Sequence, residues 1–225
     1  MIRYFIVLSL IFTSMLALAD NGLCFDEKAY EYYEPEKNDF VQLQVLNDKV
    51  TAFRGENHST PVHLTVGEQI LAQKEDGDVG AVLTNNRFLA VSSGSESWLT
   101  KSLYDGESES ARLLVGKEVA MVVTDQRIIG FSAKYNRLIE YPLSVGDDIV
   151  ASDVGQNIGV VVLPDRAVGF SADSADFSTV QFDYGGAFHS LEAAADVALV
   201  TTDNKIYAYR SAGGSWSARD IPPKE

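Results

Sequence analysis

Hydrophobic and polar positions recur in blocks along this chain. Each block has an apolar run, a two-residue polar turn and a second apolar run, as in VAMVVTDQRIIGF from Val119 to Phe131. Blocks of this form surround five basic residues spaced 38, 40, 39 and 39 apart, namely Lys49, Arg87, Arg127, Arg166 and Lys205. A fixed period of this length indicates a repeat architecture.

Each block predicts a β-hairpin. β-Branched and aromatic residues suit strands, and Asn and Asp suit the tight turns between them. Runs such as Ala120–Val123 and Gly159–Val162 have no polar face, so we expect these strands to be buried on both sides between stacked sheets. Ala120 and Gly159 stand at a position that is small in four of the five blocks, and we expect another backbone to pass close to it.

Two more strand-like runs follow each of the first four hairpins, for example Trp98–Leu103 and Ala111–Lys117, and one follows the last. Four strands in a repeat of about 39 residues are typical of a β-propeller blade. We therefore predict an all-β fold, a single five-bladed β-propeller with repeats at about 41–78, 79–118, 119–157, 158–196 and 197–225. The last repeat ends at Pro222-Pro223 without a fourth strand, and we expect Ala29–Glu34 to supply that strand and close the ring.

The first 19 residues read as a cleaved signal peptide. Arg3 precedes an apolar run, and Ala17-Leu18-Ala19 is a small-residue cleavage signal, so residues 20–225 form the mature domain. The sequence has no second long apolar run, and no membrane span is expected. The single cysteine, Cys24, cannot form an internal disulfide, so packing alone must stabilise the fold, which for an exported protein favours a bacterial periplasm. We expect the protein to be exported, to the periplasm or to the outside of the cell.

The mature chain is strongly acidic. Removing residues 1–19 takes away Arg3 from 18 Lys and Arg and leaves 17 against 32 Asp and Glu, a net charge of −15. This balance argues against nucleic acid and anionic membrane surfaces as partners.

The last repeat resembles the pyrroloquinoline-quinone-type propeller repeat. In VTTDNKIYAYRSAGGSW, the residues that carry the resemblance are Asp203, Ile206, Tyr207, Ala208, Gly213, Gly214 and Trp216. Only Trp98 elsewhere stands at the tryptophan position, and the Asp-x-x-Thr-Gly run of that family is absent from every repeat. The resemblance implies a propeller blade without the quinone, in the manner of the non-catalytic scaffolds built from such repeats.

Candidate chemistry is sparse. His58, His63 and His189 do not have the spacing of a metal site, and we expect neither metal nor cofactor. A glycosidase needs two carboxylates across a sugar site, and the candidates are Asp125, Asp165 and Asp203. They occupy equivalent turns, which favours a turn-forming role over a catalytic one. The runs Glu107–Glu109 and Asp147-Asp148 are expected to be solvated loops.

The first repeat differs from the others at two inner-strand positions. Gln42 and Gln44 replace small and aliphatic residues there. Buried amides need hydrogen-bond partners, so we expect either a polar notch lining a central channel or a loosely packed closing blade.

The five basic residues each open a second strand, directly after a turn, and are expected to form a ring of cations on one face. Such a ring either binds an anionic partner or forms local ion pairs with the neighbouring turn acids, Asp48, Asp125, Asp165 and Asp203. We expect a non-catalytic, exported module that binds or scaffolds another protein. A lectin-like glycan binder and, after it, a glycoside hydrolase are the alternatives.

Overall fold

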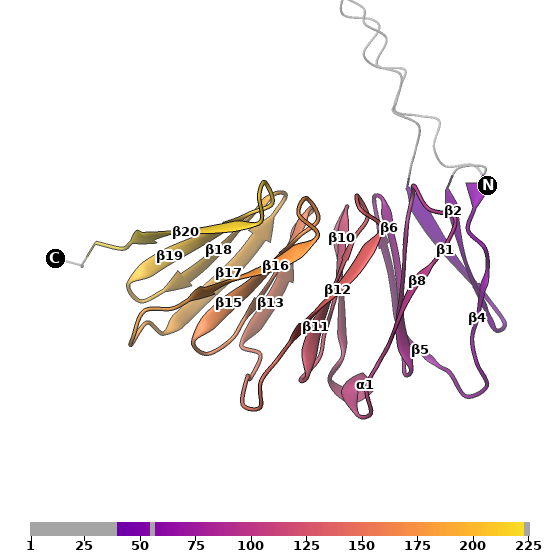
Figure 1. The fold of residues 1–225 in the computed structure, drawn as a ribbon, viewed down its shortest axis with the longest axis horizontal. Coiled ribbons are helices and arrows are strands. Elements are labelled where there is room, and N and C mark those ends of the chain that lie inside the picture. The colour runs from indigo at the N-terminus through magenta and orange to yellow at the C-terminus, as the bar shows by residue number, and fades with distance from the viewer. Residues whose placement is uncertain (1–39, 55–56, 223–225) are drawn as a thin grey trace, which may run out of the picture. The chain divides into compact units, whose positions relative to one another are not determined.

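The computed structural model of this 225-residue chain describes residues 40–54 and 57–222. These residues form five four-stranded antiparallel sheets, the blade organisation of a β-propeller, and a single helical turn, α1 (Glu107–Ser110) (Figure 1). No described helix is long and apolar enough to cross a membrane. The predicted signal peptide, Cys24 and the segment Ala29–Glu34 lie outside the described residues, so ring closure by that segment stays a prediction.

Each of the last four sheets is a simple meander. The second sheet contains β5 (Ile70–Asp76), β6 (Val79–Thr84), β7 (Arg87–Ser92) and β8 (Leu99–Ser102). The third contains β9 (Arg112–Val115), β10 (Val119–Val123), β11 (Arg127–Ser132) and β12 (Arg137–Pro142). The fourth contains β13 (Ala151–Val154), β14 (Ile158–Val162), β15 (Arg166–Ser171) and β16 (Asp176–Gln181). The fifth contains β17 (Phe188–Ala194), β18 (Val197–Thr202), β19 (Lys205–Arg210) and β20 (Ser215–Asp220).

The first sheet is less regular. Its hairpin is formed by β1 (Val41–Leu46) and β2 (Lys49–Arg54), and two short strands, β3 (Asn57–His58) and β4 (Val62–His63), both pair with β2.

The predicted strands that fall within the described residues exist, but they group into sheets differently from the sequence repeats. The run predicted as the fourth strand of a repeat is the first strand of the next sheet: Val115 pairs with Ala120, across the short turn Gly116–Glu118. A short turn joins antiparallel neighbours, whereas the longer segment 103–111 carries the chain from one sheet to the next. The last sheet therefore already has four strands, and the prediction that it lacks one is wrong.

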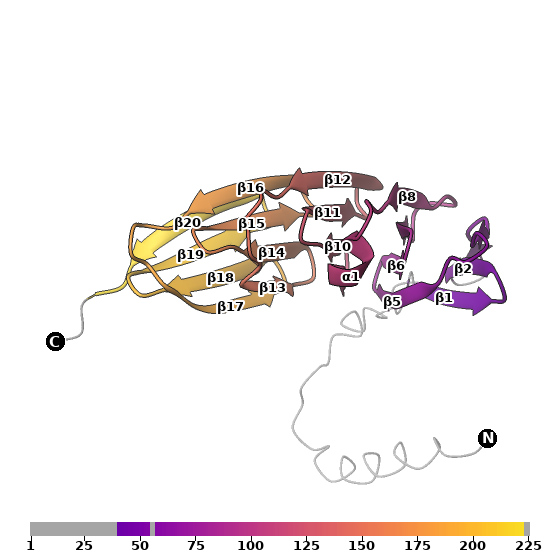
Figure 2. The same ribbon diagram turned by 90° about the horizontal axis from the view of Figure 1, so that it is seen from below.

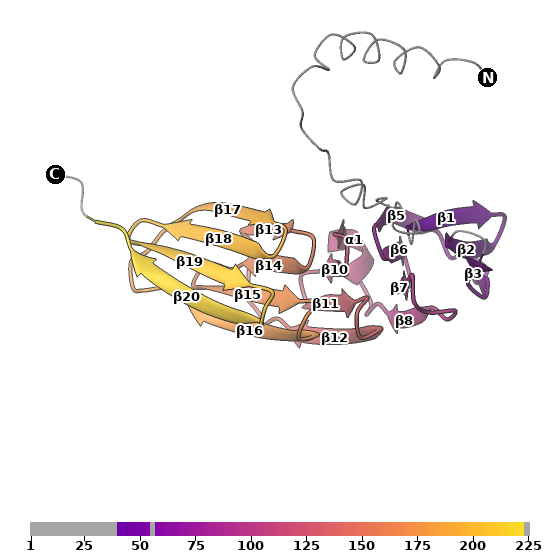
Figure 3. The ribbon, with the colours of Figure 1, turned by 90° about the horizontal axis from the view of Figure 1, so that it is seen from above.

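Successive sheets pack face to face. Figures 2 and 3 show the first strands β5, β13 and β17 along one edge of the packed sheets and the last strands β8, β12 and β16 along the other. Both faces of β10 and β14 are fully buried, as their unbroken apolar runs predict. The fifth sheet differs, because Leu199 and Ile206 on its outward face are 41% and 38% exposed.

Small residues on one sheet receive large side chains from its neighbour. A Cβ at Gly159 would overlap the side chain of Met121, and a Cβ at Gly130 would lie 2.7 Å from the ring of Phe170. The prediction that a backbone passes close to Gly159 is therefore wrong, because the group that fills the space is a side chain of the preceding sheet. Backbones do approach each other at Gly116, where a Cβ would overlap the carbonyl oxygen of Gly155.

A row of backbone hydrogen bonds joins the turns at that end of the sheets. Asp78 N–H donates to Lys117 O at 2.8 Å, Glu118 N–H to Gln156 O at 2.8 Å, and Asn157 N–H to Ala195 O at 3.1 Å. These equivalent bonds fix neighbouring sheets at one end, and the opposite end carries the basic residues singled out in the sequence.

Replacing Gly159 by Leu tests the packing between sheets. We expect a loss of at least about 1–3 kcal/mol in the free energy of unfolding, because a well-packed interior cannot take the added side chain without strain. Urea denaturation measures the change. The exposed Gly94, where a Cβ would meet nothing within 4 Å, provides the matched control Gly94→Leu, and equal stability of the two variants would contradict the packing.

Candidate functional site

The five predicted cations all lie at one end of the sheets. Each is the first residue of its strand, in β2, β7, β11, β15 and β19, as predicted. Lys49 is exposed, but the other four turn toward the segment that connects their sheet to the preceding one. These four side chains thus hold the connections between sheets.

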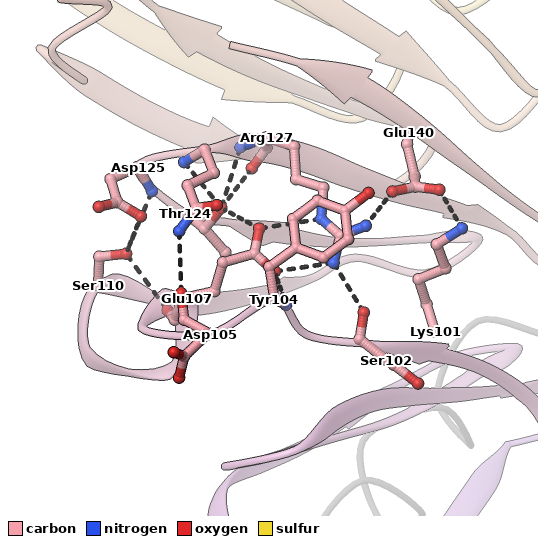
Figure 4. Close-up of polar contacts among 11 residues, drawn as sticks. Lys101, Ser102, Tyr104, Asp105, Glu107, Ser110, Thr124, Asp125, Arg127 and Glu140 are labelled. Carbon is pink, nitrogen blue, oxygen red and sulfur yellow. Dashed lines mark hydrogen bonds and ion pairs between the residues drawn. The ribbon is translucent and has the colours of Figure 1, made fainter. Parts of the chain in front are cut away.

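Arg127 shows the arrangement most fully (Figure 4). Its side chain is only 2% exposed, and it donates from Nε and Nη2 to both carboxylate oxygens of Glu107, at 2.9 and 2.7 Å. Nη2 also donates to Ser102 O at 2.7 Å, and Nη1 pairs with Glu140. The ring of Tyr104 covers the guanidinium, with its centroid 3.6 Å from Cζ. Burial lowers the pKa of Arg127, but the hydrogen bonds to Glu107 and Glu140 outweigh it and raise the pKa.

Arg87 repeats this geometry one sheet earlier. It donates to the two carboxylate oxygens of Glu68 at 2.8 and 3.0 Å, and to His63 O at 2.7 Å. The same carboxylate accepts from the hydroxyl of Thr84 at 2.8 Å. Burial raises the pKa of Glu68, but the hydrogen bonds from Arg87 and the backbone of Thr65 outweigh it, and the pKa falls to about 2.

The last two connections carry simpler pairs. Arg166 binds Asp147 at 2.6 Å, and this hydrogen bond raises the pKa of Arg166. Lys205 binds Asp183 at 2.6 Å, which raises the pKa of the lysine. Pairing with the adjacent turn acid is found only at Arg166, which also contacts Asp165 at 2.9 Å.

The paired carboxylates belong to four equivalent tight turns. In each turn the third residue is a glycine with a φ of +80 to +94°, as a type II turn requires, and the fourth N–H donates to the first carbonyl at 2.9 to 3.2 Å. In three turns the fourth residue is the acid, and its carboxylate also accepts the backbone N–H of the first residue. The four connecting turns are Thr65–Glu68, Tyr104–Glu107, Ser144–Asp147 and Asp183–Gly186.

The second residue of each connecting turn points into solvent. Val66, Val145 and Tyr184 occupy this position in three turns and are fully exposed, and the fourth turn has the exposed Asp105. The hairpin turns lie beside the connecting turns, since Leu143 N–H donates to Gln126 O at 2.8 Å. We call these four connecting turns and the hairpin turns beside them the turn face.

Two grooves lie on the turn face. The first has a volume of about 560 Å³ and is lined by Tyr104, Asp125, Leu143, Val145 and Asp148 among others. The second, of about 510 Å³, is lined by Pro164, Asp165, Phe182 and Tyr184 among others. Both are formed in the same way, by the hairpin turn of one sheet and the connecting turn that follows it.

Sequence reasoning missed the connecting turns and misplaced their acids. Glu107 is buried and Asp147 is ion-paired, so the expectation of solvated loops at Glu107–Glu109 and Asp147-Asp148 is wrong for these two residues. A signal was present, because Gly67, Gly106, Gly146 and Gly185 stand 20 or 21 residues before the successive basic residues. The pairing itself was hidden, because about 20 residues separate the partners along the chain.

The remaining candidate residues lie apart. Gln42 and Gln44 are exposed on β1 and not buried, because they point away from the second sheet. His63 contacts Asp48 at 3.3 Å, His189 contacts Asp203 at 2.5 Å, and His58 contacts the adjacent Ser59 O. Among residues 40–54 and 57–222, no cluster of three or more His, Cys, Asp or Glu has the arrangement of a metal site.

No protein-family model matches the sequence, and no curated protein matches it. Prp20p from Saccharomyces cerevisiae is similar in structure, with 9% identity and a TM-score of 0.42 over 76% of this chain and 55% of that chain. The WD40 domain of SCAP from fission yeast has 12% identity and a TM-score of 0.38 over 83% of this chain and 54% of that chain. This chain therefore spans little more than half the length of either. The assignment of a propeller-type repeat is based on the five four-stranded sheets of the structure. No family match supports the pyrroloquinoline-quinone type in particular.

Replacing Arg127 by Met tests the buried pair. We expect a loss of about 3–5 kcal/mol in the free energy of unfolding, because the change leaves Glu107 buried without its counter-charge. Lys134 pairs with Asp173 near the opposite end of the sheets and is half exposed, so Lys134→Met is the control and should change little. Urea denaturation of both variants at pH 7 decides the matter, and a fully stable Arg127→Met would refute the assigned role.

The lowered pKa of Glu68 predicts a pH dependence of stability. A carboxylate whose pKa is lower in the folded protein than in the unfolded chain stabilises the fold above the unfolded value of 4.5, and this contribution is lost as the pH falls through about 2. We expect Glu68→Gln to be less stable than the parent by up to about 3 kcal/mol at pH 7 and nearly equal to it near pH 2. The exposed Glu96→Gln is the control, and a difference that is constant with pH would contradict the assignment.

Proposed function

We propose that this chain is an exported, non-catalytic module that binds another protein through its turn face. The observation that carries the proposal is the repeated exposure of Val66, Val145 and Tyr184 at the same position of equivalent turns. Single exposed apolar residues are ordinary on a protein surface. Repetition at one turn position, on one end of the molecule, favours a shared contact surface.

The turns are held in place before any partner arrives. Each is closed by its own hydrogen bond, and the ion pairs of Arg87, Arg127 and Arg166 tie three of them to the next sheet. Ordering mobile loops and side chains weakens binding, so side chains presented by fixed turns contribute more of their contact energy to affinity. Tyr184 is fully exposed, and tyrosine is one of the residue types enriched among the anchors of protein interfaces.

Export and the absence of catalysis belong to the same proposal. The N-terminal 19 residues have the composition of a signal peptide. The acids considered for glycosidase chemistry have local partners, since Asp125 contacts the hydroxyl of Ser110 at 2.9 Å and Asp203 contacts His189. These contacts support a structural role for the turn acids.

Serine replacement of the three exposed side chains tests the turn face. Val66→Ser, Val145→Ser and Tyr184→Ser together should leave the melting temperature nearly unchanged, because the side chains contact little of the protein. Affinity capture from the exported fraction of the native cell, followed by mass spectrometry, should lose its main protein partner.

The matched control replaces exposed apolar residues away from the turn face, Phe40, Tyr135 and Leu199, by Ser. It should capture the same partner as the parent. A partner retained by the turn-face variant, or capture of glycan and no protein, would refute the proposal.

A further inference from the structure

The turn face carries a charge opposite to the one its basic residues predict. Ion pairs with acids of the connecting turns neutralise the positive charges of four basic residues, Arg87, Arg127, Arg166 and Lys205. The exposed acids beside these pairs are Asp48, Asp105, Glu109, Asp125, Asp148, Asp165, Asp203 and Asp220, of which Asp165 also contacts Arg166 and Asp220 lies 3.7 Å from Lys205. Against these eight carboxylates stand three exposed cations at the same end of the sheets, Lys49, Arg112 and Arg219, so the described turn face has a net charge of about −5 (3 − 8), counting His63 and His189 as neutral.

Each groove places an acid next to an exposed apolar side chain. Asp125 and Asp148 line the first groove with Val145 and Tyr104. Asp165 lines the second groove with Tyr184. The two grooves are related by one step of the repeat, so a chain crossing the turn face meets the same combination twice.

We propose, resting on the proposed function above, that the partner segment is a cationic polypeptide whose Lys or Arg side chains alternate with apolar ones. The ammonium or guanidinium groups would lie against Asp125, Asp148 and Asp165, and the apolar side chains would contact Val145. A cation also gains from the face of an exposed tyrosine ring, which Tyr184 offers beside Asp165. One-signed potential over a concave surface raises the association rate of an oppositely charged partner.

Fluorescence anisotropy with synthetic peptides tests the charge and apolar requirements. The probes are a labelled 12-residue peptide of alternating Arg and Leu, the same peptide with Glu for Arg, and the same peptide with Ser for Leu. With the mature chain we expect the Arg-Leu peptide to bind at least tenfold more tightly than either control peptide. Its affinity should fall at least fivefold between 50 and 500 mM NaCl.

Two charge-matched variants locate the binding. The first variant should bind the Arg-Leu peptide with an affinity at least tenfold lower. It combines four substitutions on the turn face, Asp105→Asn, Asp125→Asn, Asp148→Asn and Asp165→Asn. The control replaces four exposed acids away from the turn face, Asp76→Asn, Glu96→Gln, Asp176→Asn and Glu192→Gln, and removes the same charge. It should change affinity less than twofold.

Equal weakening by both variants would show attraction by net charge alone and overturn the inference, as would tight binding of the Glu-Leu peptide. The proposed function fails separately. If the turn-face serine variant loses its captured partner while the four-acid variant keeps it, the turn face binds protein but the partner is not cationic.

Discussion

Close packing between successive sheets is the constraint on which the described structure depends. The strands β10 and β14 have no polar face, so each needs a sheet on both sides. Small residues such as Gly130 and Gly159 allow the neighbouring sheet to approach, because each receives one large side chain. Once the sheets are packed in this way, the turns at their two ends fall into rows at fixed spacing.

The two rows of turns are secured by different interactions. At one end, backbone N–H groups of one turn donate to the carbonyl of the next, and Gly116 leaves room for that approach. At the other end, a basic side chain reaches back to the connecting turn. A buried ion pair contributes little net stability compared with apolar packing, but it penalises any arrangement that separates its charges. The pairs of Arg87 and Arg127 therefore fix the position of their turns, because a displaced turn would leave Glu68 or Glu107 without its counter-charge.

This arrangement changes what a partner meets. Four basic residues that recur with the repeat are placed where ion pairs cancel their charge, and the exposed apolar side chains stand among exposed carboxylates. Arg87 and Arg127 hold the connecting turns in place, but because they are ion-paired they add no net positive charge to the turn face. Under the proposed function, a protein partner would contact Val145 and Tyr184 and the acids beside them, and the guanidinium of Arg127, only 2% exposed, would lie beneath the contact.

The 39-residue period, the hairpins and the burial of both faces of the central strands follow from the sequence, because strand formation and turn chemistry depend on neighbouring residues. The departure at Gln42 and Gln44 was also visible, but its meaning was not, since only the packed structure shows that they point away from the second sheet. The grouping of strands into sheets was misjudged, because the period is the same whichever strand begins the repeat. The partners of Arg87 and Arg127 were likewise decided by the tertiary structure. Glu68 and Glu107 lie 19 and 20 residues away along the chain, and only the stacking of one sheet on the next brings each carboxylate to its guanidinium.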